Sequence, residues 1–363
     1  MRIGIIGLPQ SGKTTLFNAL TKTSQDAAPP QFGKKDVNIS SVKVPDARVD
    51  WLHTIYPTAK KTFTTIEYLD VAGLEKGSTQ RKGFQEQFLG NIRNVDALLC
   101  VVRAFQNDAV PHAEGSVDAA RDLTIIQEEF LLSDMALLEG RIERVSSEAK
   151  KIKSEEKQKE LELYQRCMAA LEKETPLRAL DFNEAEEKMM RGYQFLTAKP
   201  ILLVLNVGEK ELGKEAQIKQ DFAKFVTDKN TALEVVSAEL EMEIAQLPES
   251  EKETFQKEMG ISEPALNKVI RNSYQLLGLI SFLTAGDKEV RAWTIRDGTR
   301  AHAAAGAIHS DIERGFIRAE VVHFDILKKW GSFAKCKDQG VLRLEGKEYL
   351  VQDGDVITFR FNI

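Results

Sequence analysis

The residues from Gly7 to Thr14 follow the pattern G-x-x-x-x-G-K-T, which is the phosphate-binding P-loop. The apolar run 1–6 before the pattern predicts a buried strand, and the residues after Thr14 have the spacing of a helix. Strand, glycine loop and helix in this order are the context that the motif requires. The sequence therefore predicts an α/β domain that binds the phosphates of a nucleotide at this loop, rather than a chance match in a surface turn.

The residue types in the loop indicate how it would hold phosphate. Gly7 and Gly12 let the backbone curl so that successive N–H groups point inward, and the helix N-terminus adds a partial positive charge. We expect the Lys13 ammonium to reach the β- and γ-phosphates and the Thr14 hydroxyl to bind Mg²⁺. The expected nucleotide contacts in this region are Pro9, Gln10, Ser11, Gly12, Lys13, Thr14 and Thr15.

A second motif, Asp-x-x-Gly, lies at Asp70–Gly73 and closes a β-rich run. An Asp at the carboxyl end of a strand beside a P-loop can hold Mg²⁺, directly or through water, and the Gly73 N–H can bond a γ-phosphate. Thr14 and Asp70 are therefore the predicted metal ligands, and Lys13 and Gly73 are predicted to take part in catalysis. Leu74 stands where Ras-like GTPases carry the Gln that orients the attacking water, so slow unassisted hydrolysis is expected.

The base-binding motif of GTPases, Asn-Lys-x-Asp, is altered here to Asn-Val-Gly-Glu at the end of an apolar strand. Glu209 is longer than Asp and moves the carboxylate that would pair with guanine, and Val207 lacks the aliphatic stem of lysine. Adenine has a ring acceptor at N1, which such a carboxylate cannot match, so ATP is favoured over GTP. The Ala238 N–H, after the next strand, is expected to reach the purine. The predicted base contacts are Asn206, Val207, Glu209, Ser237 and Ala238.

The chain changes character from about residue 122 to 173. Leu138, Ile142 and Val145 recur at spacings of four and three among charged residues, which is a heptad seam. A second apolar stripe follows a stretch dense in Lys and Glu. The pattern predicts an antiparallel helical hairpin with coiled-coil packing, whose seam either only joins two helices or also supports partner binding.

The last part of the chain consists of short β runs separated by turns, with one helix expected at Ala303–Ile312. This texture predicts a small, mostly β domain packed around that helix. The expected division of the chain is a P-loop domain at 1–124 and 198–278, an inserted hairpin at 125–197 and a C-terminal domain at 279–363.

The composition limits other functions. The chain has 363 residues and a formal net charge of −5 with both signs mixed, so nucleic-acid contact would need a local basic patch. The three cysteines lie far apart, which disfavours a zinc site or a disulfide framework. No apolar stretch approaches the length of a membrane span, and no signal peptide precedes the first strand. We expect a cytoplasmic monomer without membrane contact.

Several stretches resemble the YchF family, the Obg-like ATPases, and the resemblance covers essentially the whole chain. The order of P-loop, Asp-Val-Ala-Gly-Leu and Asn-Val-Gly-Glu is similar to that family. The most specific stretches are Glu289–Trp293, Ala304–His309, Gly315–Glu320 and Asp353–Asn362. The resemblance implies a Ras-like P-loop core, an inserted helical hairpin and a C-terminal TGS domain with the β-grasp, ubiquitin-like fold.

The resemblance also implies an ATPase that prefers ATP over GTP, hydrolyses it weakly and associates with ribosomes. Leu74 matches a hydrophobic residue that replaces the catalytic Gln in this family, and His112 matches a histidine proposed to assist hydrolysis. The alternative for His112 is a loop histidine without chemistry. Contact with the ribosome or its RNA is expected through the hairpin, the C-terminal domain or both, against the alternative of solvated surfaces. The candidate residues are Arg141, Arg144, Lys150, Lys151, Lys153, Arg291, Arg296, Arg300, Arg314 and Arg318.

The chain departs from the family pattern in two regions. The run Pro-Phe-x-Thr-Ile, whose Thr can close on Mg²⁺, is replaced by Gln31–Lys35 and following residues without a threonine before Thr54. The P-loop carries Gln10 in place of an Asn that is associated with potassium-assisted hydrolysis. Two other functions therefore remain open: a nucleotide-binding scaffold with negligible hydrolysis, and a GTP-specific translation-factor GTPase.

Overall fold

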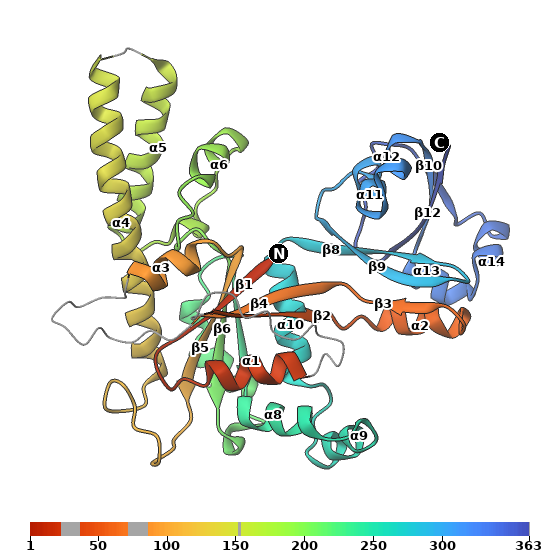
Figure 1. Cartoon of the computed structure of the whole chain (residues 1–363), viewed down its shortest axis with the longest axis horizontal. Coiled ribbons are helices and arrows are strands. Elements are labelled where there is room, and N and C mark those ends of the chain that lie inside the picture. Colours follow the sequence, from red (N-terminus) through yellow and green to blue (C-terminus); the bar gives the residue numbers. More distant parts are fainter. Residues whose placement is uncertain (23–36, 72–85, 152–153, 363) are drawn as a thin grey trace. The chain divides into compact units, whose positions relative to one another are not determined.

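The computed structural model describes residues 1–22, 37–71, 86–151 and 154–362 (Figure 1). The chain divides into two compact units. The first unit comprises Met1–Val42 and Glu67–Leu276, and the second comprises Lys43–Ile66 and Leu277–Ile363. Residues 43–66, which are predicted to belong to the P-loop domain, group instead with the C-terminal residues.

The first unit is built on a six-stranded sheet in the order β2-β4-β1-β5-β6-β7. The five strands from β4 to β7 in this order are parallel to their neighbours. Apolar sequences such as that of β6 are buried along their whole length, as expected for strands covered on both faces. The strands are β1 (Arg2–Ile6), β2 (Val37–Lys43), β4 (Thr65–Val71), β5 (Ala97–Ala104), β6 (Ile201–Val207) and β7 (Thr231–Val236).

Helices cover both faces of this sheet. Phe88 of α3, Phe130 of α4 and Phe222, which follows α7, pack against Leu203 and other strand residues on one face. On the other face α10 contacts β5, β6 and β7. Among the described residues, the helices of this unit outside the hairpin are α1 (Lys13–Lys22), α3 (Glu86–Arg93), α6 (Glu184–Arg191), α7 (Glu215–Asp221), α8 (Ala238–Gln246), α9 (Glu249–Glu258) and α10 (Ala265–Leu276), with short 3-10 turns η1 (Leu177–Ala179), η2 (Glu209–Glu211) and η3 (Ala223–Phe225).

The predicted helical hairpin is confirmed as α4 (Ala119–Lys151) and α5 (Glu155–Leu171), drawn in yellow in Figure 1. The side chains of Leu138 and Val145 from α4 are buried against Tyr164 of α5. The following helix is α6 (Glu184–Arg191), and beyond its end the backbone φ reaches 49° at Gln194.

A buried carboxylate ties the hairpin to the sheet unit. Asp134 of α4 accepts hydrogen bonds from the backbone N–H groups of Leu196 and Thr197, at 3.1 and 2.7 Å, and from the Thr197 hydroxyl. Arg93 adds an ion pair at 3.1 Å. Burial raises the pKa of Asp134, and the donors around it oppose that rise.

The second unit contains a mixed six-stranded sheet in the order β11-β10-β12-β8-β9-β3. The expected single helix at Ala303–Ile312 is instead two helices, because the backbone is extended at His309, which caps the second helix. The strands are β3 (Lys60–Thr62), β8 (Leu279–Ala285), β9 (Glu289–Arg296), β10 (Phe316–His323), β11 (Arg343–Glu345) and β12 (Asp355–Phe361). The helices are α2 (Ala47–Ile55), α11 (Ala301–Ile308), α12 (Ser310–Arg314), α13 (Phe324–Trp330) and α14 (Phe333–Asp338).

The segment 43–66 completes one face of this second sheet. Val49 and Leu52 of α2 are fully buried against Val290 and Ala292 of β9, and β3 pairs in parallel with β9. The opposite face packs on α11 through a separate cluster that includes Ala304. The names TGS and coiled coil for these parts of the chain remain predictions.

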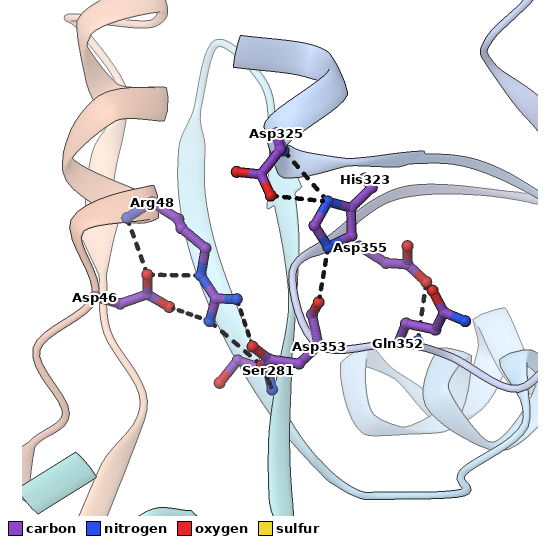
Figure 2. A network of polar contacts seen from close by, with 8 residues as sticks. All are labelled: Asp46, Arg48, Ser281, His323, Asp325, Gln352, Asp353 and Asp355. Atoms are coloured by element: carbon purple, nitrogen blue, oxygen red, sulfur yellow. Dashed lines mark hydrogen bonds and ion pairs between the residues drawn. The ribbon is translucent and has the colours of Figure 1, made fainter. Parts of the chain in front are cut away.

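Polar contacts connect the same segment to a turn of the C-terminal region (Figure 2). Arg48 of α2 pairs with Asp353 at 2.7 Å and with its neighbour Asp46 at 2.8 Å. Asp353 also accepts the Ser281 N–H at 2.8 Å, and its carbonyl lies 3.2 Å from His323 Nε2. Together these carboxylates raise the pKa of Arg48, although burial acts in the opposite direction.

No helix among the described residues is long and apolar enough to cross a membrane.

Replacing Leu52 by Ala is expected to lower the free energy of unfolding of the second unit by about 2–5 kcal/mol, because the side chain is fully buried. Hydrogen exchange of the amides in β8, β9 and β12 measures this effect. The matched control is Leu344→Ala on β11, where the side chain is 60% exposed and a change within about 0.5 kcal/mol is expected. Unchanged exchange in β9 for Leu52→Ala would contradict the assignment of residues 43–66 to this unit.

Candidate nucleotide-binding site

The P-loop connects β1 to α1 at the carboxyl edge of the parallel sheet, where open α/β sheets bind ligands. Its backbone has positive φ values of 150° at Gly7, 60° at Gln10 and 92° at Gly12. A Cβ at Gly7 would lie 2.1 Å from the Val101 carbonyl oxygen, so glycine is required for space as well as conformation. A left-handed Gln is uncommon, whereas Asn adopts this region more readily. The loop therefore has a backbone conformation that is strained at Gln10.

Lys13 is buried beneath this loop. Its ammonium donates to the carbonyl oxygens of Gly7 and Leu8, at 3.0 and 2.7 Å. Burial lowers the pKa of Lys13 to about 8, and the nearby Asp70 carboxylate opposes this shift. The ammonium therefore lies against the loop, and it loses its proton at a lower pH than an exposed lysine does.

Thr14 and Asp70, the predicted metal ligands, lie together. The Thr14 hydroxyl donates to Asp70 Oδ2 at 3.3 Å, and Asp70 is the last but one residue of β4, beside Ile5 of β1. Burial raises the pKa of Asp70, against the influence of Thr14 and Lys13. No cluster of three or more His, Cys, Asp or Glu side chains that could hold a metal occurs in the part of the chain that the structure describes. One hydroxyl and one carboxylate suit Mg²⁺, which usually completes its shell with phosphate oxygens and water.

Asn206 links the P-loop to the predicted base side. Its side-chain amide donates to the Ser11 carbonyl at 2.9 Å, and its Oδ1 accepts the Ala238 N–H at 3.0 Å. A Cβ at Gly12 would lie 2.1 Å from Asn206 Nδ2, so the amide packs directly on the glycine. The buried side chain of Asn206 therefore holds two loops from distant parts of the sequence in one arrangement.

The other residues predicted to contact the base lie around this bridge. Ser237 occupies the N-cap position of α8 without a capping hydrogen bond from its side chain, and it is buried, as is Ala238. Val207 is the last residue of β6 and is buried, whereas Glu209 begins η2 and is exposed. The Ala238 N–H is already bonded to Asn206, so it supports the loop rather than standing free for a purine.

The loop after β5 is held at its two ends by arginines. Arg103, opposite Asn206 in the sheet, is buried and donates to the carbonyls of Phe105, Asn107 and Val110. Arg121 of α4 donates to the Ser116 carbonyl at 2.7 Å. These bonds fix the backbone on both sides of His112.

His112 is buried rather than presented to solvent. Its Nε2 lies 2.9 Å from Asp122 Oδ2, and its Nδ1 accepts the Glu114 N–H at 3.0 Å. The side chains of His112 and Asp122 are 3% and 2% exposed. Since both ring nitrogens are engaged, the histidine has no free atom for a water in this arrangement.

Several residues singled out in the sequence lie outside the described residues: Gly73, Leu74, Lys153 and Gln31–Lys35. Among those described, Lys13, Thr14 and Asp70 come together as expected, and Asn206 contacts the P-loop backbone. Asp122 was not predicted, because its only sequence signal is an acidic residue in the first turn of a long helix.

The fold and this loop geometry define a P-loop nucleotide-binding protein. Residues 2–133 match a family model described as 50S ribosome-binding GTPase, and residues 279–362 match the model of the YchF GTPase C-terminal region, described as a protein of unknown function. The solved structure of the Schizosaccharomyces pombe YchF GTPase is similar with a TM-score of 0.86 and 31% identity, covering 99% of this chain and 97% of that one.

Full-length relatives agree with these matches. The ribosome-binding ATPase YchF of Bacillus subtilis is 44% identical, with 99% of each chain covered, and that of Escherichia coli O157:H7 is 41% identical over 100% of this chain and 99% of the relative. Obg-like ATPase 1 of Caenorhabditis elegans is 39% identical, over 100% of this chain and 92% of the relative. The chain belongs to the YchF family.

The lowered pKa of Lys13 predicts a pH dependence of ATP binding. Below about pH 8 the free protein already carries the charged ammonium that the triphosphate favours. Above that pH, Lys13 must take up a proton from solution when ATP binds, so the affinity for ATP is expected to fall as pH rises. Calorimetry at pH 9 in two buffers of different ionisation enthalpy should detect uptake approaching about one proton, and almost none at pH 7.

Lys199→Met is the matched control for this measurement. Burial also lowers the pKa of Lys199 to about 8, but its ammonium donates to the Val95 carbonyl, away from the P-loop. The proton uptake should therefore persist in this variant. Uptake that disappears with Lys199, or an affinity independent of pH between 7 and 9, would contradict the assignment to Lys13.

Proposed function

We propose that this protein is a Mg²⁺-dependent ATPase that prefers ATP over GTP and acts as a nucleotide-dependent switch on the ribosome. The observation that carries the proposal is the P-loop with Lys13 buried beneath it and Thr14 bonded to Asp70. The names of its relatives, ribosome-binding ATPases, support the same activity and partner. A ribosome partner would put the protein in the cytoplasm.

The proposed reaction is attack by water on the γ-phosphorus, in line with the bond to the bridging oxygen, which leaves with ADP. The loop amides and Lys13 bind the β- and γ-phosphates and offset the charge of the transition state. Mg²⁺ held by Thr14 and Asp70 would neutralise further phosphate charge. Gly73 would donate its N–H to the γ-phosphate, and His112 would orient the water, because Leu74 cannot.

The preference for ATP rests on Glu209 and Val207 in place of the residues that recognise guanine. Equilibrium competition is expected to show ATP binding at least tenfold more tightly than GTP, a difference of about 1.4 kcal/mol. The variant Glu209→Asp, which shortens an exposed side chain, should move the ratio toward GTP. Tenfold tighter binding of GTP to the unaltered protein would instead support the orthodox GTPase.

The alternative scaffold function is tested by turnover. Single-turnover hydrolysis of ATP by the unaltered protein should exceed that of Lys13→Ala, which lacks the ammonium that binds the phosphates. Equal rates, together with tight ATP binding by the unaltered protein, would support a scaffold in which the nucleotide is only a structural ligand.

We propose that this chain acts on the ribosome through three domains. They are the P-loop domain, the hairpin, and a C-terminal TGS domain that includes residues 43–66. Arg141 stacks on Tyr193 and Arg291 on Trp293, so both have roles within the fold. Arg144 and Arg318 are exposed and are better sites for charge reversal.

Cosedimentation with ribosomes should weaken as salt increases, because contacts to RNA phosphates release counterions. Arg144→Glu and Arg318→Glu test the hairpin and the C-terminal region separately. The variant whose part of the chain contacts the ribosome should show a weaker salt dependence. The slope of log binding constant against log salt concentration should fall by about one unit for each lost phosphate contact. Binding that is independent of salt and unaffected by both variants would argue against an electrostatic contact through these surfaces.

A further inference from the structure

The pair His112–Asp122 has a defined hydrogen-bonding state. Because Nδ1 of His112 accepts the Glu114 N–H, the neutral ring carries its proton on Nε2 and donates it to Asp122 Oδ2. The other oxygen of Asp122 is also engaged, since Arg121 donates to Oδ1 from Nε and Nη2, at 3.1 and 2.8 Å. Asp122 is therefore a shared acceptor that joins the loop to the first turn of α4.

This pair lies next to the P-loop. His112 and Asp122 line one small space together with Leu8, Pro9 and Ser11, and that space has no volume for a water molecule. The Ser11 hydroxyl is buried and forms no hydrogen bond. The imidazole is thus adjacent to the nucleotide loop but separated from any solvent that could serve as nucleophile.

We propose, on the basis of the ATPase function above, that Asp122 is a positioning residue that holds His112 in an inactive arrangement through this hydrogen bond. Asp122 keeps the Nε2 proton of His112 engaged and the ring out of contact with water. Hydrolysis assisted by His112 requires this hydrogen bond to open. Since Asp122 lies on α4, which also forms one side of the hairpin, a partner that displaces α4 would change the distance between the two side chains.

Removal of the acceptor should therefore accelerate the reaction. In single-turnover assays with Mg²⁺ and ATP, Asp122→Ala is expected to hydrolyse ATP about tenfold faster than the unaltered protein, or more. A tenfold change corresponds to about 1.4 kcal/mol, which is on the order of one hydrogen bond to a charged group. The gain must depend on His112, so Asp122→Ala combined with His112→Ala should fall to the rate of His112→Ala alone.

Two variants separate the holding of His112 by Asp122 from general loosening of the helix. Asp122→Asn keeps a side-chain oxygen that can accept the Nε2 proton, while its NH2 group faces the Arg121 guanidinium, so its rate should lie well below that of Asp122→Ala. Asp118→Ala removes the carboxylate that accepts the backbone N–H of Arg121, at 3.0 Å, at the start of the same helix. It leaves the His112–Asp122 hydrogen bond in place. Its rate should be unchanged.

The ring itself provides a readout that needs no nucleotide. In ¹H–¹⁵N spectra of the free protein, His112 should show the Nε2–H tautomer with a slowly exchanging proton, retained in Asp122→Asn and fast-exchanging in Asp122→Ala. A proton on Nδ1, or a rate for Asp122→Ala that is equal to or below that of the unaltered protein, would overturn the proposal. So would an acceleration that survives in the double variant. Failure of the ATPase function itself is recognised separately, by a rate no higher than that of Lys13→Ala.

Discussion

The contact between the Asn206 amide and the backbone at Gly12 is the constraint on which the nucleotide site depends. One side chain from β6 donates to the P-loop and accepts from the N–H of the first residue of α8, so it links the predicted phosphate and base regions. The contact leaves no room for a Cβ on the glycine. A buried amide with both ends satisfied is also favourable in a dry interior, where an unpaired one would cost about 1–3 kcal/mol.

Buried charges organise the region around this link. Arg103 lies near the end of β5, Lys13 begins α1 and Asp122 lies in the first turn of α4, and each is held by carbonyls or by an opposite charge. Residues from the P-loop, the loop after β5 and the base of the hairpin line one small space, among them Ser11, Arg103 and Asp122. Polar groups buried in this way are costly to leave unsatisfied.

Much of this architecture follows from local sequence patterns. Patterns of neighbouring residues predict the apolar strands, the P-loop and the heptad seam. Asp70 is predicted as a site residue because it stands near the end of such a strand. The pairing of His112 with Asp122 has no periodic signature, and neither does the break at His309. The strand β3 is only three residues of polar sequence, and its partner β9 lies more than two hundred residues away, so no local pattern reveals it.

The position of residues 43–66 determines which truncated chains would retain a complete folded unit. Both ends of that segment continue into strands of the nucleotide sheet, while its own apolar side chains, such as Val49 and Leu52, belong to the interior of the other unit. A chain stopped before Leu279 would carry these side chains without their partners and expose them to water. The two units are thus interleaved in the gene, so neither can be lost or exchanged by a single cut.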